Sequence, residues 1–171
     1  QVPAEALTDS EFAAIYKEAQ KYVGTPYVWG GSTPETGFDC SGYVCWVYNQ
    51  NGYNVGRTTA NGLWNKSQHI SEAEAKPGDL VFFEGTYDTP GKSHVGSYLG
   101  NGKMVSAGDP IKYADIHSSY WQQHLGFLGA LAFQKALLHQ FFDGGGSGCW
   151  GTDALTLHAL RHTVCTRCLH S

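Results

Sequence analysis

One stretch near residue 40 joins a glycine-rich loop to the start of a helix, and the fold can be built outward from it. It reads Phe38-Asp39-Cys40-Ser41-Gly42-Tyr43-Val44. Apolar residues follow at helical spacing up to Asn51-Gly52, which predicts a helix over 41–51. The residues before it, 24–38, are rich in glycine and proline and predict a long structured loop.

Helical patterns continue on both sides of this stretch. Near the N-terminus, apolar residues recur at helical spacing: Phe12, Ile15, Tyr16, Ala19, Tyr22 and Val23. They predict a first helix that ends at Gly24 and is capped by Thr8 with Glu11, or by Asp9 or Ser10. A short third helix is expected over about 58–67.

Beyond the turn at residues 76–79 the apolar period changes from helical to alternating. Strands are expected over 80–83, 93–99 and 103–107, the last two joined by a three-residue loop, 100–102. Residues 125–133 predict a last strand or the start of a helix. Helices followed by an antiparallel meander place the chain in the α+β class, with N-terminal helices packed on the β-meander.

Composition limits the classes of function. With 171 residues, 42% of them hydrophobic and 15% charged, the chain suits one globular domain and excludes a disordered chain or a coiled coil. A net charge of −4 offers no basic surface for nucleic acid. No stretch approaches the ~20 apolar residues of a membrane span. The chain begins at Gln1 rather than Met, so we expect a fragment or a processed form.

The composition shifts near residue 134, which predicts a domain over 1–133 and a tail of uncertain structure over 134–171. The tail contains a linker-like run, 144–148, and three of the five cysteines. Its Cys149, His158, His162, Cys165, Cys168 and His170 suggest a zinc site at first sight. The full spacing matches no zinc-finger pattern, however, so we expect no metal, and an unfolded tail or an altered reading frame are the other interpretations.

Cys40 is the candidate nucleophile. A helix N-terminus lowers the pKa of a thiol and offers N–H groups to a developing oxyanion, and the small Ser41 and Gly42 leave room for a substrate. The alternative is that Cys40 is a small buried hydrophobe. Cys45 lies about 140° farther around the same helix, so it cannot bridge to Cys40 and is expected in the core.

His94 is the candidate base, at the start of the strand 93–99 with the small Gly96 beside it. With a three-residue hairpin loop, Gly96 faces Ser106, and His94 lies diagonal to Ser106 at roughly 7–8 Å. Ser106 could then orient the imidazole, although weakly, because it is small and neutral. The alternatives are a hydrogen-bonded edge-strand histidine and a strand serine without a role.

Four blocks carry a resemblance to a known family. They are Gly24-Thr25-Pro26-Tyr27-Val28-Trp29-Gly30-Gly31, Phe38-Asp39-Cys40-Ser41-Gly42, Pro77-Gly78-Asp79-Leu80-Val81-Phe82-Phe83 and His94-Val95-Gly96-Ser97-Tyr98-Leu99-Gly100. In this order they resemble the NlpC-type cell-wall cysteine peptidases. The stretch Ser118-Ser119-Tyr120-Trp121 is most similar to the CwlT-like hydrolases of conjugative elements.

The resemblance implies a papain-like α+β fold and an enzyme that cuts the stem peptide of bacterial peptidoglycan between γ-D-glutamate and the diamino acid. It implies Cys40 as nucleophile, His94 as base and Tyr27 beside the thiol, with Asp39 and Ser41 receiving the free amino end of the stem peptide. A carboxylate can pair with an ammonium group in a narrow site, but Asp39 could equally be only a helix cap. No cofactor is required, and a monomer that is secreted or acts in the bacterial cell wall is expected.

The third catalytic position departs from the family pattern, because Ser106 stands where His, Asn or Gln is usual. A loosely held imidazole would lower activity, and a water bridge or Asp109 could substitute. Two other functions therefore stay open: a papain-like amidase that cuts the sugar–peptide link, and a catalytically impaired wall-binding module. The residues around Cys40 favour the peptidase, and the intact Cys40 and His94 argue against a pure binder.

Overall fold

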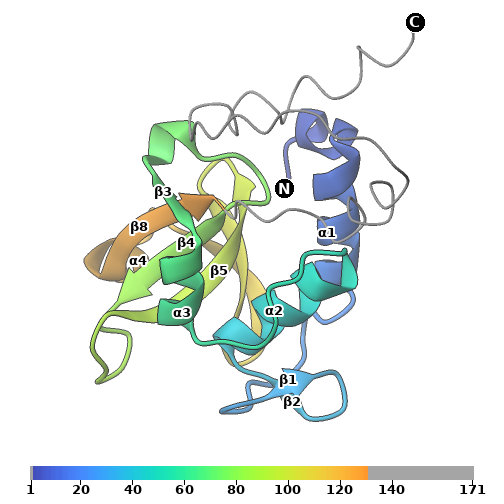
Figure 1. The fold of residues 1–171 in the computed structure, drawn as a ribbon. Coiled ribbons are helices and arrows are strands. Elements are labelled where there is room, and N and C mark those ends of the chain that lie inside the picture. Colours follow the sequence, from blue (N-terminus) through green and yellow to red (C-terminus); the bar gives the residue numbers. More distant parts are fainter. Residues whose placement is uncertain (1, 131–171) are drawn as a thin grey trace, which may run out of the picture. The chain divides into compact units, whose positions relative to one another are not determined.

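The structure, a computed structural model, describes residues 2–130 of the chain. Its elements in order are η1 (Ala4–Thr8), α1 (Ser10–Gln20), β1 (Ser32–Thr33), β2 (Gly37–Phe38), α2 (Cys40–Gln50), α3 (Ala60–Lys66), β3 (Gln68–Ile70), η2 (Glu72–Glu74), β4 (Leu80–Glu84), β5 (Lys92–Gly100), β6 (Lys103–Ala107), β7 (Ile111–Asp115), α4 (Ser119–His124) and β8 (Leu125–Ala130). Helices come first and an antiparallel sheet follows (Figure 1), as expected for the α+β class.

The six-stranded sheet has the order β3-β8-β4-β5-β6-β7, and every neighbouring pair is antiparallel. Strands β4, β5 and β6 form the predicted meander, and β7 extends it by one strand. Strand β8 departs from it, because it returns between β3 and β4. The local sequence pattern does not encode this long-range pairing, and the short strands β3 and β7 and helix α4 were not predicted either.

Both faces of the central strands are buried, and their alternation divides the core in two. Leu80 and Phe82 of β4 point to the face covered by α1, α2 and α3, whereas Val81 and Phe83 point to the opposite face. Helix α2 packs on β5 and β6, and α4 packs beside β4 (Figure 1). The start of α2 therefore lies against the central strands of the sheet.

Helix α1 is capped by Asp9, the second of the three predicted caps. The side chain of Asp9 accepts hydrogen bonds from the backbone N–H groups of Glu11 (2.9 Å) and Phe12 (3.2 Å). The helix ends at Gln20 rather than at residue 23, because the following N–H groups bond three residues back and tighten the chain into turns. The third helix, Ala60–Lys66, lies within its predicted range.

The hairpin between β5 and β6 corrects the predicted three-residue loop. Gly100 pairs with Lys103, so the loop has two residues, Asn101 and Gly102, both with positive φ (50° and 68°), as in a type I′ turn. A bulge at Leu99 then restores the expected register, in which Tyr98 pairs with Met104. The same register continues toward Gly96 and Ser106, so the predicted neighbours are correct although the loop length was wrong.

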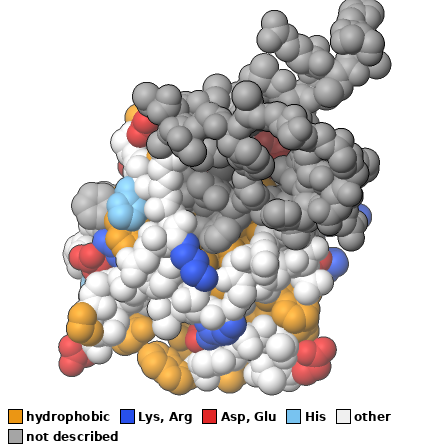
Figure 2. Space-filling model, in the orientation of Figure 1, with side chains coloured by type: hydrophobic (Ala, Val, Ile, Leu, Met, Phe, Trp, Pro, Cys, Tyr) orange, Lys and Arg blue, Asp and Glu red, His pale blue; other side chains and the backbone are white. Residues whose placement is uncertain are grey.

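Charged side chains of both signs lie on the surface of the described residues (Figure 2). On the face shown in Figure 2, Lys and Arg side chains of the described residues are interspersed with Asp and Glu. Within residues 2–130, no helix has the length and hydrophobicity needed to cross a membrane. The boundary predicted near residue 133 and the tail with its suggested zinc ligands lie outside the described residues.

Candidate active site

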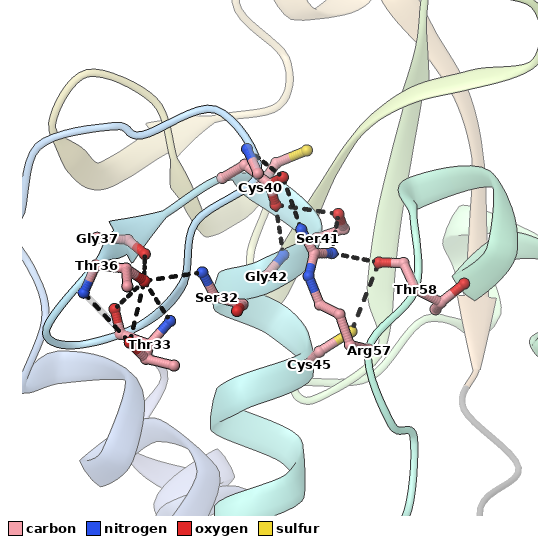
Figure 3. Close-up of polar contacts among 12 residues, drawn as sticks. Ser32, Thr33, Thr36, Gly37, Cys40, Ser41, Gly42, Cys45, Arg57 and Thr58 are labelled. Atoms are coloured by element: carbon pink, nitrogen blue, oxygen red, sulfur yellow. Dashed lines mark hydrogen bonds and ion pairs between the residues drawn. The ribbon is translucent and has the colours of Figure 1, made fainter.

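Cys40 is the first residue of α2, and its side chain is only 7% exposed. Asp39 precedes it as the helix cap in an extended conformation (φ −90°, ψ 179°), which turns the chain abruptly into the helix. The Cys40 thiol donates to the backbone oxygen of Ser93, with Sγ and O 3.9 Å apart. The sulfur thus points at β5, away from the Ser41 and Arg57 side chains (Figure 3).

The carboxylate of Asp39 accepts four hydrogen bonds. Its Oδ1 accepts from the Gly42 N–H (2.6 Å) and the Ser41 hydroxyl (3.1 Å). Its Oδ2 accepts from the Gly30 N–H (3.1 Å) and Arg57 Nη2 (2.8 Å). Two carboxylate oxygens offer about four acceptor positions, so Asp39 is saturated by the chain itself. An ammonium group arriving here would have to share these oxygens.

Arg57 is a member of this cluster that sequence reasoning missed. Besides Asp39, its guanidinium donates to the Ser41 hydroxyl (2.9 Å) and to the backbone oxygen of Thr58 (2.5 Å) (Figure 3). Its side chain remains 39% exposed. The residue stands in a loop 18 positions after Asp39, and no local pattern marks it as a partner.

Two tyrosines from different loops lie near the thiol. Burial, with smaller contributions from the charges of Cys40 and Asp39, raises the pKa of Tyr27 to about 12. Burial and the same two charges raise the pKa of Tyr87. The Tyr87 ring lies 5.3 Å, centroid to centroid, from that of Trp29, which is 71% exposed. The position of Tyr27 beside the thiol stays a prediction, which the electrostatic effect of Cys40 on Tyr27 supports.

His94 lies on β5 opposite Phe83 and is buried. Its Nε2 has no hydrogen-bond partner among the described residues. The imidazole instead stacks on Trp121, with ring centroids 5.0 Å apart and planes 28° apart, and also contacts the ring of Phe83 at 5.9 Å. A buried polar atom without a partner is costly in a folded protein, so Nε2 is a candidate functional group.

Ser106 lies on β6 and is also buried. A Cβ placed on Gly96 would come within 3.1 Å of the Ser106 Cβ, which confirms that these two residues face each other across the strands. No hydrogen bond joins Ser106 to His94 among the described contacts. Asp109, the suggested substitute, accepts instead from the backbone N–H of Tyr27 at 3.4 Å.

Burial dominates the electrostatics of the thiol and the imidazole. It raises the pKa of Cys40 to about 11, with a further increase from the Asp39 charge, while backbone N–H groups of Val95, Ser41 and Cys40 act in the opposite direction. It lowers the pKa of His94 to about 4. In the resting structure both groups are therefore neutral at pH 7, and the N–H groups around the sulfur are donors that a developing oxyanion could use.

Cys40 and Cys45 are both free and buried, and Cys45 lies in the core as expected. Within the described part of the chain, no cluster of three or more His, Cys, Asp or Glu side chains could hold a metal ion.

Comparisons with known proteins, by sequence and by structure, agree on one protein family. Residues 24–128 match the sequence model of the NlpC/P60 family. The chain is 49% identical over 121 residues to the bifunctional muramidase/DL-endopeptidase CwlT of Bacillus subtilis, covering 70% of this chain and 36% of that protein. It is 40% identical over 114 residues to the gamma-DL-glutamyl hydrolase of the same organism, covering 65% of this chain and 27% of that protein.

A solved structure agrees. An NLP/P60 family protein from Staphylococcus aureus, described as similar to lipoprotein, superposes with a TM-score of 0.70 and 44% identity, covering 72% of this chain and 42% of that one. The chain thus spans between about a quarter and two fifths of the length of these relatives. From the matched segment and the shared fold, the chain belongs to the NlpC/P60 family.

Proposed function

We propose that this domain is a cysteine peptidase that cleaves the stem peptide of bacterial peptidoglycan between γ-D-glutamate and the diamino acid. The observation that carries the proposal is the position of Cys40. Its thiol lies at the N-terminus of α2 and faces β5, where the next residue after its hydrogen-bond partner Ser93 is His94. The names of the relatives, DL-endopeptidase and gamma-DL-glutamyl hydrolase, support the choice of bond.

The reaction begins with transfer of the Cys40 proton to His94, which gives a thiolate and an imidazolium. The thiolate attacks the γ-carbonyl carbon of D-glutamate, and the carbonyl electron pair moves to oxygen. Backbone N–H groups near Cys40 and Val95 stabilise this oxyanion. When the intermediate collapses, the C–N bond breaks and the amine of the diamino acid leaves with the proton from His94.

Water completes the cycle. His94 takes a proton from a water molecule that attacks the thioester, the C–S bond breaks, and Cys40 recovers its thiol while the γ-carboxyl group is released. No cofactor enters these steps. Tyr27 flanks the thiol, and the cluster of Asp39, Ser41 and Arg57 forms the wall that faces the amino end of the stem peptide.

A wall-binding module is the second candidate, and one observation favours it. His94 has no hydrogen bond at Nε2 and none to Ser106, the residue at the third catalytic position. A histidine without an orienting hydrogen bond makes a weaker base. The buried thiol beside β5 still favours an enzyme, because binding alone requires neither Cys40 nor His94. With either function we propose action in the cell wall or outside the cell.

The test is mass spectrometry of purified stem peptides incubated with the reduced protein and with Cys40→Ala. We expect products that end in γ-D-glutamate, and none with the variant. Products separated at the sugar–peptide link would assign the protein to the amidases. Intact peptides that nevertheless bind the folded protein would assign it to the wall-binding modules.

A further inference from the structure

His94 is held in place by aromatic rings rather than by hydrogen bonds. Its Nε2 has no partner among the described residues, and no hydrogen bond joins the ring to Ser106. Trp121 and Phe83 instead lie against the imidazole, with ring centroids at 5.0 Å and 5.9 Å. Trp121 is the more parallel of the two, at 28° against 49°.

Helix α4 holds Trp121 in this position through several contacts with the rest of the fold. The Trp121 ring also packs on Phe83, at 4.5 Å between centroids. On the same helix, His124 Nδ1 lies 2.9 Å from the backbone oxygen of Glu84, and the Gln122 side chain donates to the backbone oxygen of Ile116 at 2.9 Å. These contacts fix the indole relative to β4, whose residue Phe83 pairs with His94 of β5.

The groups that surround His94 leave it without a charged partner. Its two ring contacts, Phe83 of β4 and Trp121 of α4, carry no charge. The charged residues of β4 and β5, Glu84 and Lys92, form an ion pair with each other. Burial alone lowers the pKa of His94.

We propose that Trp121 is a positioning residue for His94. Its indole face fixes the orientation of the imidazole and stabilises the imidazolium formed when Cys40 gives up its proton. In this chain it fills the place of the hydrogen bond that a longer side chain at position 106 would supply. The inference rests on the proposed peptidase function.

The physical basis is the quadrupole of the indole ring, whose negative face attracts a cation within about 6 Å. Burial opposes the charged form of His94, and a desolvated cation gains more from such a face than an exposed one. The imidazolium exists only after proton transfer, so the contact stabilises the reacting state more than the resting state. Such differential stabilisation raises kcat rather than lowering KM.

The test compares Trp121→Leu, Trp121→Phe and the control Tyr120→Leu in a stem-peptide cleavage assay. Tyr120 lies on the same helix and contacts Trp121 and His124, but it has no ring contact with His94. We expect kcat to fall about tenfold with Leu and about threefold with Phe, with KM within twofold throughout. Tyr120→Leu should stay within twofold of wild type in both constants.

A second measurement does not depend on catalysis. NMR titration of the His94 ring should show a lower pKa in Trp121→Leu than in wild type, with Trp121→Phe between them. An unchanged or higher pKa in Trp121→Leu would overturn the inference, even if the wild-type protein proved inactive. A wild type that cleaves no stem peptide would instead overturn the proposed function, so the two failures are distinguishable.

The most specific test combines Trp121→Leu with a substitution at position 106. Ser106→Asn places an amide at the strand position that faces Gly96. In that background we expect Trp121→Leu to cost about threefold in kcat rather than tenfold, because two groups now orient the same ring. Equal losses in both backgrounds, or a loss confined to KM or to thermal stability, would contradict a positioning role.

Discussion

Asp39, beside the proposed nucleophile Cys40, accepts four hydrogen bonds, whereas the Nε2 of His94 has none. The cysteine side of the site is a polar network that ties the start of α2 to the loop at Gly30 and to Arg57. The histidine side is an aromatic cluster on β4, β5 and α4. The two groups that we propose to act together in catalysis are thus held by different kinds of force.

The difference has a physical consequence for tolerance to mutation. A charge-assisted network depends on each donor and acceptor, since a buried group left without its partner is penalised. Ring packing fixes the plane of the imidazole without using a hydrogen bond at Nε2. The histidine side is therefore the place where a residue of the family pattern could change to Ser106 while the fold was kept.

The largest expected effect on stability comes from removing the carboxylate of the polar network beside Cys40. Asp39→Ala removes the helix cap and leaves Arg57, Ser41 and two backbone N–H groups without their acceptor. We expect the free energy of unfolding to fall by roughly 4 kcal/mol, measured by urea denaturation. Asp39→Asn, which keeps a capping oxygen, should lose about half as much. Equal losses of unfolding free energy in Asp39→Ala and Asp39→Asn would mean that the charge on Asp39 contributes nothing.

The next largest effect is a pH dependence on the histidine side. Burial lowers the pKa of His94 from 6.5 to about 4, so between these values the unfolded chain binds a proton that the folded chain does not. The stabilisation is complete above pH 6.5 and is lost as the pH falls through 4, by about 3 kcal/mol.

Urea denaturation of wild type and His94→Gln from pH 4 to 7 measures this contribution. The difference between the two curves should grow with pH across that interval. For Cys40 the sign is opposite, because its raised pKa makes stability fall as the pH rises from 9 through 11. Parallel curves for His94→Gln and wild type would show that the ring is solvated.

A pair of glycine substitutions compares the two sides directly. In Gly42→Ala the new Cβ would lie 2.0 Å from the backbone oxygen of Gly31, which cannot move without displacing the loop. In Gly96→Ala it would lie 2.9 Å from the Met104 sulfur, the end of a flexible side chain. We expect Gly42→Ala to be less stable than Gly96→Ala by about 2 kcal/mol in thermal or urea unfolding. A reversed order would contradict the rigid description of the cysteine side.

Several parts of this arrangement could be predicted from sequence because their causes are local. The cap Asp39, the start of α2 to within one residue and the facing of Gly96 and Ser106 all follow from short patterns. The pairing of β8 with β4, the ion pair of Arg57 with Asp39 and the stacking of Trp121 on His94 join residues far apart in the chain. Each depends on the completed fold, and neither a single arginine in a loop nor a six-residue helix carries a periodic pattern that reveals it.

The smallest expected effect concerns position 106. Ser106→Asn should raise kcat on a stem peptide about threefold to fivefold, because an amide can hold the second ring nitrogen of His94. Ser106→Ala serves as control and should leave kcat within twofold, since Ser106 makes no hydrogen bond to the ring. A loss with Asn would indicate that the site needs the space that serine leaves.

The proposed peptidase mechanism depends on attack of Cys40 on a γ-D-glutamyl carbonyl. The most direct measurement uses a γ-D-glutamyl peptide in which a diazomethyl ketone replaces the scissile amide, followed by intact-mass analysis and peptide mapping of the reduced protein. We expect one adduct per chain, on Cys40, which disappears in Cys40→Ala. A folded protein that stays unlabelled, or carries the adduct on Cys45 or another residue, would contradict it.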